Sequence, residues 1–107
     1  MPAQDAIVVL TTAGSHDEAA IIAASLVESR LAACVQVVPG VESVYWWEGR
    51  VARDSEWLLL CKTTADRYGE VEATIRELHS YTTPEVVAIR VERGSVAYLD
   101  WLRQSTL

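Results

Sequence analysis

The sequence predicts a single mixed α+β domain over residues 1–107, with the order strand, helix, strand, strand, helix, strand and a further C-terminal helix. Three observations support this prediction: short apolar runs alternate with amphipathic helical stretches, two unusually long strands follow each other in mid-chain, and 50% of the residues are hydrophobic, enough to fill one core. This order is the split βαβ or ferredoxin-like pattern.

The first strand and helix are predicted in the N-terminal third of the chain. The continuous apolar run at 6–12 is typical of a strand buried on both faces. Ser15 and Glu18 fit a capping box, in which the serine hydroxyl and the glutamate carboxylate satisfy free N–H groups at a helix start. We expect this helix to end near Leu31.

The next two strands are predicted to form a long hairpin. The first begins near Ala33, and Pro39 with Gly40 indicates a bulge rather than a strand end. Glu48 and Gly49 form a plausible tight turn before the strand at 51–62. Each arm is about twice as long as a common strand of five or six residues.

The rest of the chain repeats the helix–strand pattern. Residues 63–66 should cap a second helix that ends before Pro84. The fourth strand is predicted at 86–91. Ser95 should open the last helix. Two right-handed crossovers would place the first and third strands side by side and parallel. The predicted inner faces of the two helices consist of Val71, Ile75 and Leu78, and of Val96, Leu99 and Leu102.

The predicted hairpin overshoots the body of so small a domain. Its apolar and aromatic side chains would be an aggregation hazard in a monomer, and pairing with other subunits removes that hazard. We therefore expect an oligomer, in which the number of chains is not determined by these residues. The residues concerned are Val44, Tyr45, Trp46, Trp47 and Trp57.

The net charge and the N-terminal residues limit the partners and the location that we expect for this protein. A formal net charge of -6 argues against a nucleic-acid partner and against an anionic membrane surface. The N-terminal residues show no basic region and no long apolar run, so we expect no signal peptide and a cytoplasmic location.

Cys34 and Cys61 are expected to be free, buried thiols. A symmetric turn would pair Cys34 with Thr63, and a bulge would shift that register by one.

Several motifs, in order and at matching spacing, resemble the CutA divalent-cation-tolerance family. The resemblance implies a homotrimer with PII-like architecture, in which long hairpins complete sheets between subunits, and a link to divalent cation tolerance, copper especially. The motifs are AACV at 32–35, PGV at 39–41, SVYWWEG at 43–49, LCKTT at 60–64, Tyr81 followed by TPE at 83–85, and AYLDWL at 97–102.

The resemblance also implies a candidate metal site. The copper site proposed for the family combines a cysteine with a histidine and a glutamate, and the last two match His79 and Glu85. Thr11 stands in place of the cysteine, so the soft thiolate is missing. We therefore expect weak binding of Cu(II) or another divalent cation. The alternative interpretations are a helix C-terminal charge for His79 and an ordinary surface carboxylate for Glu85.

A second candidate site would bind a small anion or nucleotide between subunits. If the first and third strands were parallel neighbours, both following helices would open on one edge, close to Lys62. Tyr81 and Trp47 are candidates for walls of that intersubunit cleft, although ordinary helix caps and interface aromatics explain the same residues. We recognise no pair of nucleophile and general base in the sequence, so we expect that the protein is not an enzyme. A metal-responsive trimer, a PII-like sensor and a structural adaptor remain as hypotheses.

Overall fold

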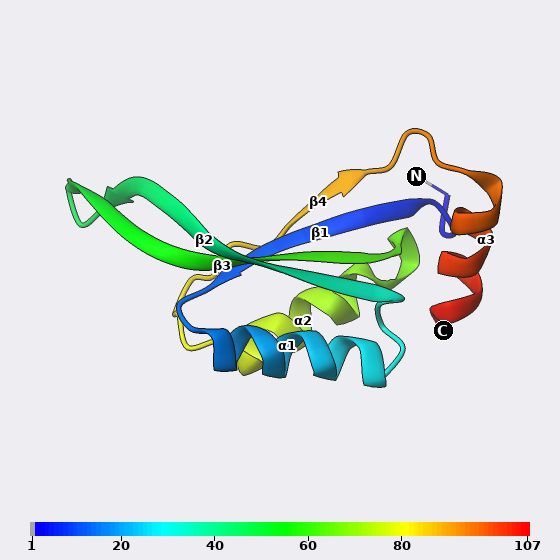
Figure 1. The fold of residues 1–107 in the computed structure, drawn as a ribbon, viewed down its shortest axis with the longest axis horizontal. Helices are drawn as coiled ribbons and strands as arrows, with labels where there is room; N and C mark the ends of the chain where they lie inside the picture. The colour runs from blue at the N-terminus through cyan, green and yellow to red at the C-terminus, as the bar shows by residue number, and fades with distance from the viewer. Residues whose placement is uncertain (1) are drawn as a thin grey trace.

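The computed structural model describes residues 2–107 and confirms the predicted α+β element order (Figure 1). Met1, where the predicted domain begins, lies outside the described residues. The elements are β1 (Ala6–Ala13), α1 (His16–Glu28), β2 (Cys34–Trp47), β3 (Arg50–Thr64), a 3₁₀ turn (Ala65–Arg67), α2 (Tyr68–Leu78), β4 (Val87–Arg90) and α3 (Val96–Ser105).

The four strands form one antiparallel sheet in the order β2-β3-β1-β4. The prediction that the first and third strands are parallel neighbours is wrong, since Ala6 pairs with Thr64 and Ala13 with Trp57. The reason is topological. The crossover makes β2 parallel to β1, and the hairpin then sends β3 back in the opposite direction. The two helices that follow β1 and β3 therefore begin at opposite ends of the sheet.

The long hairpin is confirmed, with strands of 14 and 15 residues. Glu48 and Gly49 have φ values of 49° and 79°, the left-handed pair that a two-residue hairpin turn requires. A register shift between Val38 and Val41 confirms the predicted bulge. Beyond it, Cys34 pairs with Lys62 rather than Thr63, so the bulge moves the register by one residue. Figure 1 shows the hairpin extending well past the helices.

One face of the sheet is covered by α1 and α2, as Figure 1 shows. This covered face carries Ile7, Val9 and Thr11 from β1, each at most 2% exposed, and their cross-strand partners Thr63, Cys61 and Leu59. Trp57 packs against this core within the single chain, with its ring centroid 4.9 Å from that of His16, and its predicted place at a subunit contact stays a prediction. The core is completed from the helices by Ala19, Ile22, Leu26, Val71 and Ile75.

We define the open face as the opposite side of the sheet, formed by alternate residues of all four strands. Neither α1 nor α2 lies over it, and β1 is nevertheless largely buried on both faces, as predicted. On the open face Ala6 and Thr12 are buried, and Val8 and Leu10 are half-buried. Val87 and Ile89 of β4 are 47% and 54% exposed, and Val38 of β2 is 38% exposed. Over the body of the sheet, its larger aliphatic residues are Val8, Leu10, Val38, Leu58, Leu60, Val87 and Ile89.

The helix caps and inner helix faces predicted from the sequence are confirmed only in part. Ser15 and Ser95 cap α1 and α3 as predicted, since each hydroxyl accepts a hydrogen bond from the N–H three residues on. Thr64, by contrast, makes no capping hydrogen bond. Leu78 and Val96 were predicted on inner helix faces and are 37% and 76% exposed, because both lie in terminal turns beyond the packed core. Within residues 2–107, every helix falls short of the length and apolarity that a membrane span needs.

Candidate functional site

A groove of about 690 Å³ lies beside the hairpin. We call it the hairpin groove. One wall comes from β2 and β3 beyond the bulge, and the other from the end of β1 and the segment between α2 and β4. Its lining combines three carboxylates with three aromatic rings and several hydroxyls: Thr12, Ser43, Val44, Tyr45, Trp47, Asp54, Glu56, Ser80, Tyr81, Thr82, Thr83 and Glu85.

Two of the carboxylates are oriented by tyrosine hydroxyls. The Tyr81 hydroxyl donates to Glu56 Oε2 over 2.8 Å, and the Tyr45 hydroxyl donates to Asp54. Burial, and then the hydrogen bond to Glu56, raise the pKa of Tyr81, so this hydroxyl stays a donor. The hydrogen bond to Asp54 raises the pKa of Tyr45. Glu56 is only 7% exposed and is therefore a carboxylate held in place inside the groove.

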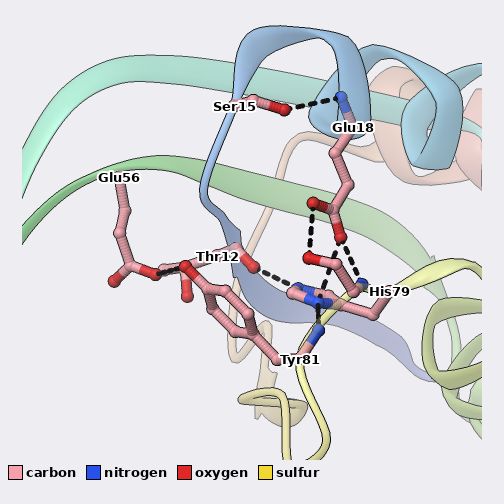
Figure 2. A network of polar contacts seen from close by, with 7 residues as sticks. Thr12, Ser15, Glu18, Glu56, His79 and Tyr81 are labelled. Carbon is pink, nitrogen blue, oxygen red and sulfur yellow. Dashed lines mark hydrogen bonds and ion pairs between the residues drawn. The ribbon is translucent and has the colours of Figure 1, made fainter.

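The position of Tyr81 depends on a buried histidine behind the groove (Figure 2). The His79 side chain is 0% exposed, and its Nε2 lies 2.5 Å from the carbonyl oxygen of Thr12. A carbonyl only accepts, so Nε2 carries the proton. Nδ1 then accepts from the backbone N–H of Tyr81 over 3.0 Å. His79 thus ties the segment that bears Tyr81 to the end of β1.

Glu18 strengthens the same connection. Its Oε1 accepts from the backbone N–H of Ser80 over 2.6 Å, and its Oε2 accepts from the Ser80 hydroxyl over 2.9 Å (Figure 2). Oε1 also lies 3.2 Å from Nδ1 of His79. The predicted capping box is therefore only half present. Ser15 caps the helix, whereas the Glu18 carboxylate turns outward to the segment between α2 and β4.

A glycine also makes room for Tyr81. A Cβ added at Gly14 would lie 3.1 Å from the Tyr81 hydroxyl, which is tighter than ordinary packing. The ring of Tyr81 lies 4.6 Å from that of His79, centroid to centroid. The loop after β1 and the buried histidine therefore determine together where this phenol enters the groove.

The three residues considered for metal binding do not form a preformed site within one chain. Thr11 is 0% exposed on the covered face, and its hydroxyl has no hydrogen-bond partner in the part of the chain that the structure describes. Both ring nitrogens of His79 are engaged, as described above. Glu85 is exposed at the groove. Among residues 2–107, no group of three or more His, Cys, Asp or Glu side chains is arranged to hold a metal ion. A metal at His79 would have to break a buried hydrogen bond.

The three residues predicted for an intersubunit ligand cleft are divided. Trp47 and Tyr81 both line the hairpin groove. Lys62 lies elsewhere, paired with Val8 and Cys34, and its amine is 5.5 Å from the centre of the Tyr98 ring. The prediction that Lys62 lies beside two helix N-termini is wrong because β1 and β3 are antiparallel.

Sequence reasoning missed Asp54 and Glu56, the carboxylates of the hairpin wall. A signal for them was present in the hairpin register. A turn at Glu48 and Gly49 places Asp54 opposite Ser43, on the strand face that alternation also gives to Tyr45 and Trp47. The approach of Tyr81 to this face could not be derived from the register, because it depends on the path of the chain after α2.

The fold and the groove define a ferredoxin-like α+β domain with an extended hairpin and a groove that is both acidic and aromatic. Residues 7–105 match the family described as CutA1 divalent ion tolerance protein. The chain belongs to this family.

Relatives and solved structures agree with that assignment. The divalent-cation tolerance protein CutA of Thermus thermophilus is 50% identical over 99 residues, which cover 92% of this chain and 96% of the relative. A structure of the Thermus thermophilus protein has a TM-score of 0.92 at 48% identity and covers 94% of this chain and 98% of its own. The crystal structure of CutA1 from Oryza sativa has a TM-score of 0.93 at 41% identity and covers 96% of this chain and 94% of its own.

The relatives differ in length and description. This chain spans 56% of the chloroplastic CutA 1 protein of Oryza sativa, to which it is 42% identical over 100 residues, equal to 94% of this chain. The CutA protein of Archaeoglobus fulgidus, whose structure has a TM-score of 0.90 at 39% identity and covers 94% of this chain and 97% of its own, is described as periplasmic.

Proposed function

We propose that the protein is a homotrimer that acts in tolerance of divalent cations, copper among them, by binding rather than by catalysis. The open face is the observation that carries this proposal. Val87, Ile89 and Val38 leave apolar surface exposed across the sheet, and the edge strands β2 and β4 have unpaired backbone groups. Contacts of one edge with another close into a ring when the rotation between copies allows it.

The hairpin supports the same assembly. Trp46 is 74% exposed near its tip, in a part of the strands that extends beyond the helices (Figure 1). Aromatic side chains in such a position are typical of the buried centre of an interface. The number of three chains and the PII-like arrangement follow from the family resemblance, and the exposed surface supplies the physical reason for association.

Two isoleucines offer a matched test of the assembly. Ile89 lies on the open face and is 54% exposed, whereas Ile21 lies on α1 and is 58% exposed. We expect Ile89→Asp to dissociate the trimer, because an unpaired charge buried in an apolar interface is costly. Ile21→Asp should leave the mass unchanged. Analytical ultracentrifugation measures both variants. A wild-type mass equal to one folded chain would contradict the proposal, as would a trimeric Ile89→Asp protein.

Metal binding by this trimer is expected to be weak. Thr11 offers no thiolate, His79 is engaged in the core, and Glu85 alone of the three is exposed. Calorimetric titration with Cu(II) and Zn(II) should give micromolar or poorer affinity. His79→Ala should change stability far more than metal affinity. A nanomolar affinity, or its loss in a folded His79→Ala protein, would show that the histidine leaves its buried position to bind the metal.

Two further predictions stay open. A PII-like anion or nucleotide sensor is not favoured in a single chain, since the hairpin groove is lined by carboxylates and Lys62 lies outside it.

The cytoplasmic location predicted from the sequence contrasts with the periplasmic description of the Archaeoglobus fulgidus relative. Cell fractionation followed by immunodetection would decide the location of this protein.

A further inference from the structure

We propose that the hairpin groove binds a small organic cation, an alkylammonium or quaternary ammonium group, with Glu56 as the anionic anchor and Trp47 and Tyr81 as aromatic walls. This inference goes beyond the role in metal tolerance. It rests on the volume of the groove, the charge of its lining and the aromatic rings that share it.

The charge of the lining selects a cation. Asp54, Glu56 and Glu85 line the groove, and none of its twelve lining residues is Lys, Arg or His. An anionic ligand would meet only like charges there. The carboxylate of Glu56 carries the most weight, because it is 7% exposed and a charge shielded from water interacts more strongly with a bound cation.

The aromatic rings select an organic cation rather than a bare metal ion. Tyr45, Trp47 and Tyr81 line the same groove as the carboxylates. The faces of such rings attract ammonium groups and also pack against their carbon atoms. A dedicated divalent metal site instead needs several converging oxygen or nitrogen ligands. The described residues contain no such convergence.

The groove has the size and rigidity of a ligand site. Its volume of about 690 Å³ lies within the usual range for small-molecule sites, roughly 300 to 1,000 Å³. The wall bearing Tyr81 is fixed by the hydrogen bonds of His79 and Glu18 shown in Figure 2. The site is therefore ordered before a ligand arrives, which lowers the entropic cost of binding.

The test uses the full-length protein in its native assembly and tetramethylammonium chloride as the probe. The chain has 4 tryptophans, so the indole N–H signals in a ¹⁵N NMR spectrum report on separate places in the fold. We expect a saturable shift of the Trp47 indole and of amides in 80–85, with millimolar affinity. The indoles of Trp57 and Trp101 should not move. Sodium chloride controls for ionic strength, and tert-butanol is a neutral probe of similar shape.

Matched variants locate the site. Glu56→Gln and Trp47→Leu should each weaken tetramethylammonium binding about tenfold. Glu42→Gln on β2 and Trp101→Leu on α3 change residues that do not line the groove, and they should leave the affinity unchanged. Sedimentation of each variant shows that the assembly is intact, so failure of this proposal is distinguishable from failure of the proposed trimer.

Three outcomes would overturn the inference. The first is a shift of equal size with tert-butanol, which would indicate apolar binding without charge selection. The second is a response to Zn(II) at these residues with none to tetramethylammonium, which would indicate a metal site. The third is the absence of any shift at the groove in the intact assembly, as expected if a second copy of the chain fills it.

Discussion

The two faces of the same sheet differ in how they are completed. On the covered face, α1 and α2 bury Val9, Leu59 and Cys61 completely. On the open face, Val87 and Ile89 keep about half of their surface exposed, although their side chains are equally apolar. The hydrophobic effect acts on both faces, but only the first is satisfied within one chain. The comparison shows how one strand pattern can encode a core and a contact surface together.

The difference between the two faces also explains the position of the hairpin groove. The bulge between Val38 and Val41 lies where β2 and β3 run past the end of β1, since Ala13 pairs with Trp57 and Val38 with Leu58. Past this point Glu56 and Asp54 accept hydrogen bonds from the hydroxyls of Tyr81 and Tyr45. A polar, ligand-sized groove is therefore placed beside an apolar surface on the same strands.

Leucines 59 and 60 give the most direct test of the comparison, with the largest expected effect. Leu59→Ala removes a fully buried side chain from the covered face and should lower the free energy of unfolding by about 2–5 kcal/mol. Leu60→Ala on the open face should cost less, and its cost should depend on protein concentration. Urea unfolding at two protein concentrations measures both. Equal, concentration-independent losses would contradict the distinction.

The two histidines of the chain test the connection that orders the groove. His79→Ala should destabilise the protein by about 2–4 kcal/mol, because it leaves a cavity and two backbone groups without partners. His16 is exposed, and His16→Ala should change stability little. Thermal unfolding of both variants gives the difference. Similar melting temperatures for the two variants would contradict the structural role that we assign to His79.

The two cysteines provide a chemical test of the comparison. Burial, with a smaller effect of Cys34, raises the pKa of the Cys61 thiol from 9.0 to about 12. Between these values the unfolded chain loses a proton that the folded chain keeps, so stability should fall as pH rises. The slope attributable to this thiol is at most about 1.4 kcal/mol per pH unit. Cys61→Ala should remove that part of the slope, and Cys34→Ala should retain it. Urea unfolding from pH 8 to about 10.5 tests this, since that range brackets the ordinary thiol pKa.

The serine caps give the smallest expected effect. Ser15 caps α1, which packs on the covered face, and Ser95 caps α3, whose first turn is exposed. Ser15→Ala should cost about 1 kcal/mol of unfolding free energy. Ser95→Ala should cost less, because fraying of α3 at Val96 exposes little buried surface. Hydrogen exchange at the two helix starts would separate them. A larger loss of stability for Ser95→Ala than for Ser15→Ala, with faster exchange at the start of α3, would contradict this ranking.

Much of the fold could be predicted from local patterns. The apolar runs, the caps at Ser15 and Ser95, the turn at Glu48 and Gly49, and the bulge after Val38 all depend on residues close together in sequence. Backbone dihedral preferences and side-chain alternation act over that short range. Trp47 and Tyr81, predicted as walls of a cleft between subunits, line one groove within a single chain, and the cleft between subunits stays a prediction.

The tertiary structure decided what depends on strand direction and on distant contacts. The antiparallel pairing of β1 with β3 moved Lys62 away from the groove, and no local pattern reports the direction of a neighbouring strand. Glu18 and Ser80 are 62 residues apart, yet their hydrogen bonds diverted the carboxylate from its predicted cap. His79 was a plausible metal ligand by residue type and became a buried link by position. By itself the sequence determined which segments become strands and helices, because that choice is made over a few residues. The partners of the polar side chains were chosen only when packing brought remote segments within hydrogen-bond distance.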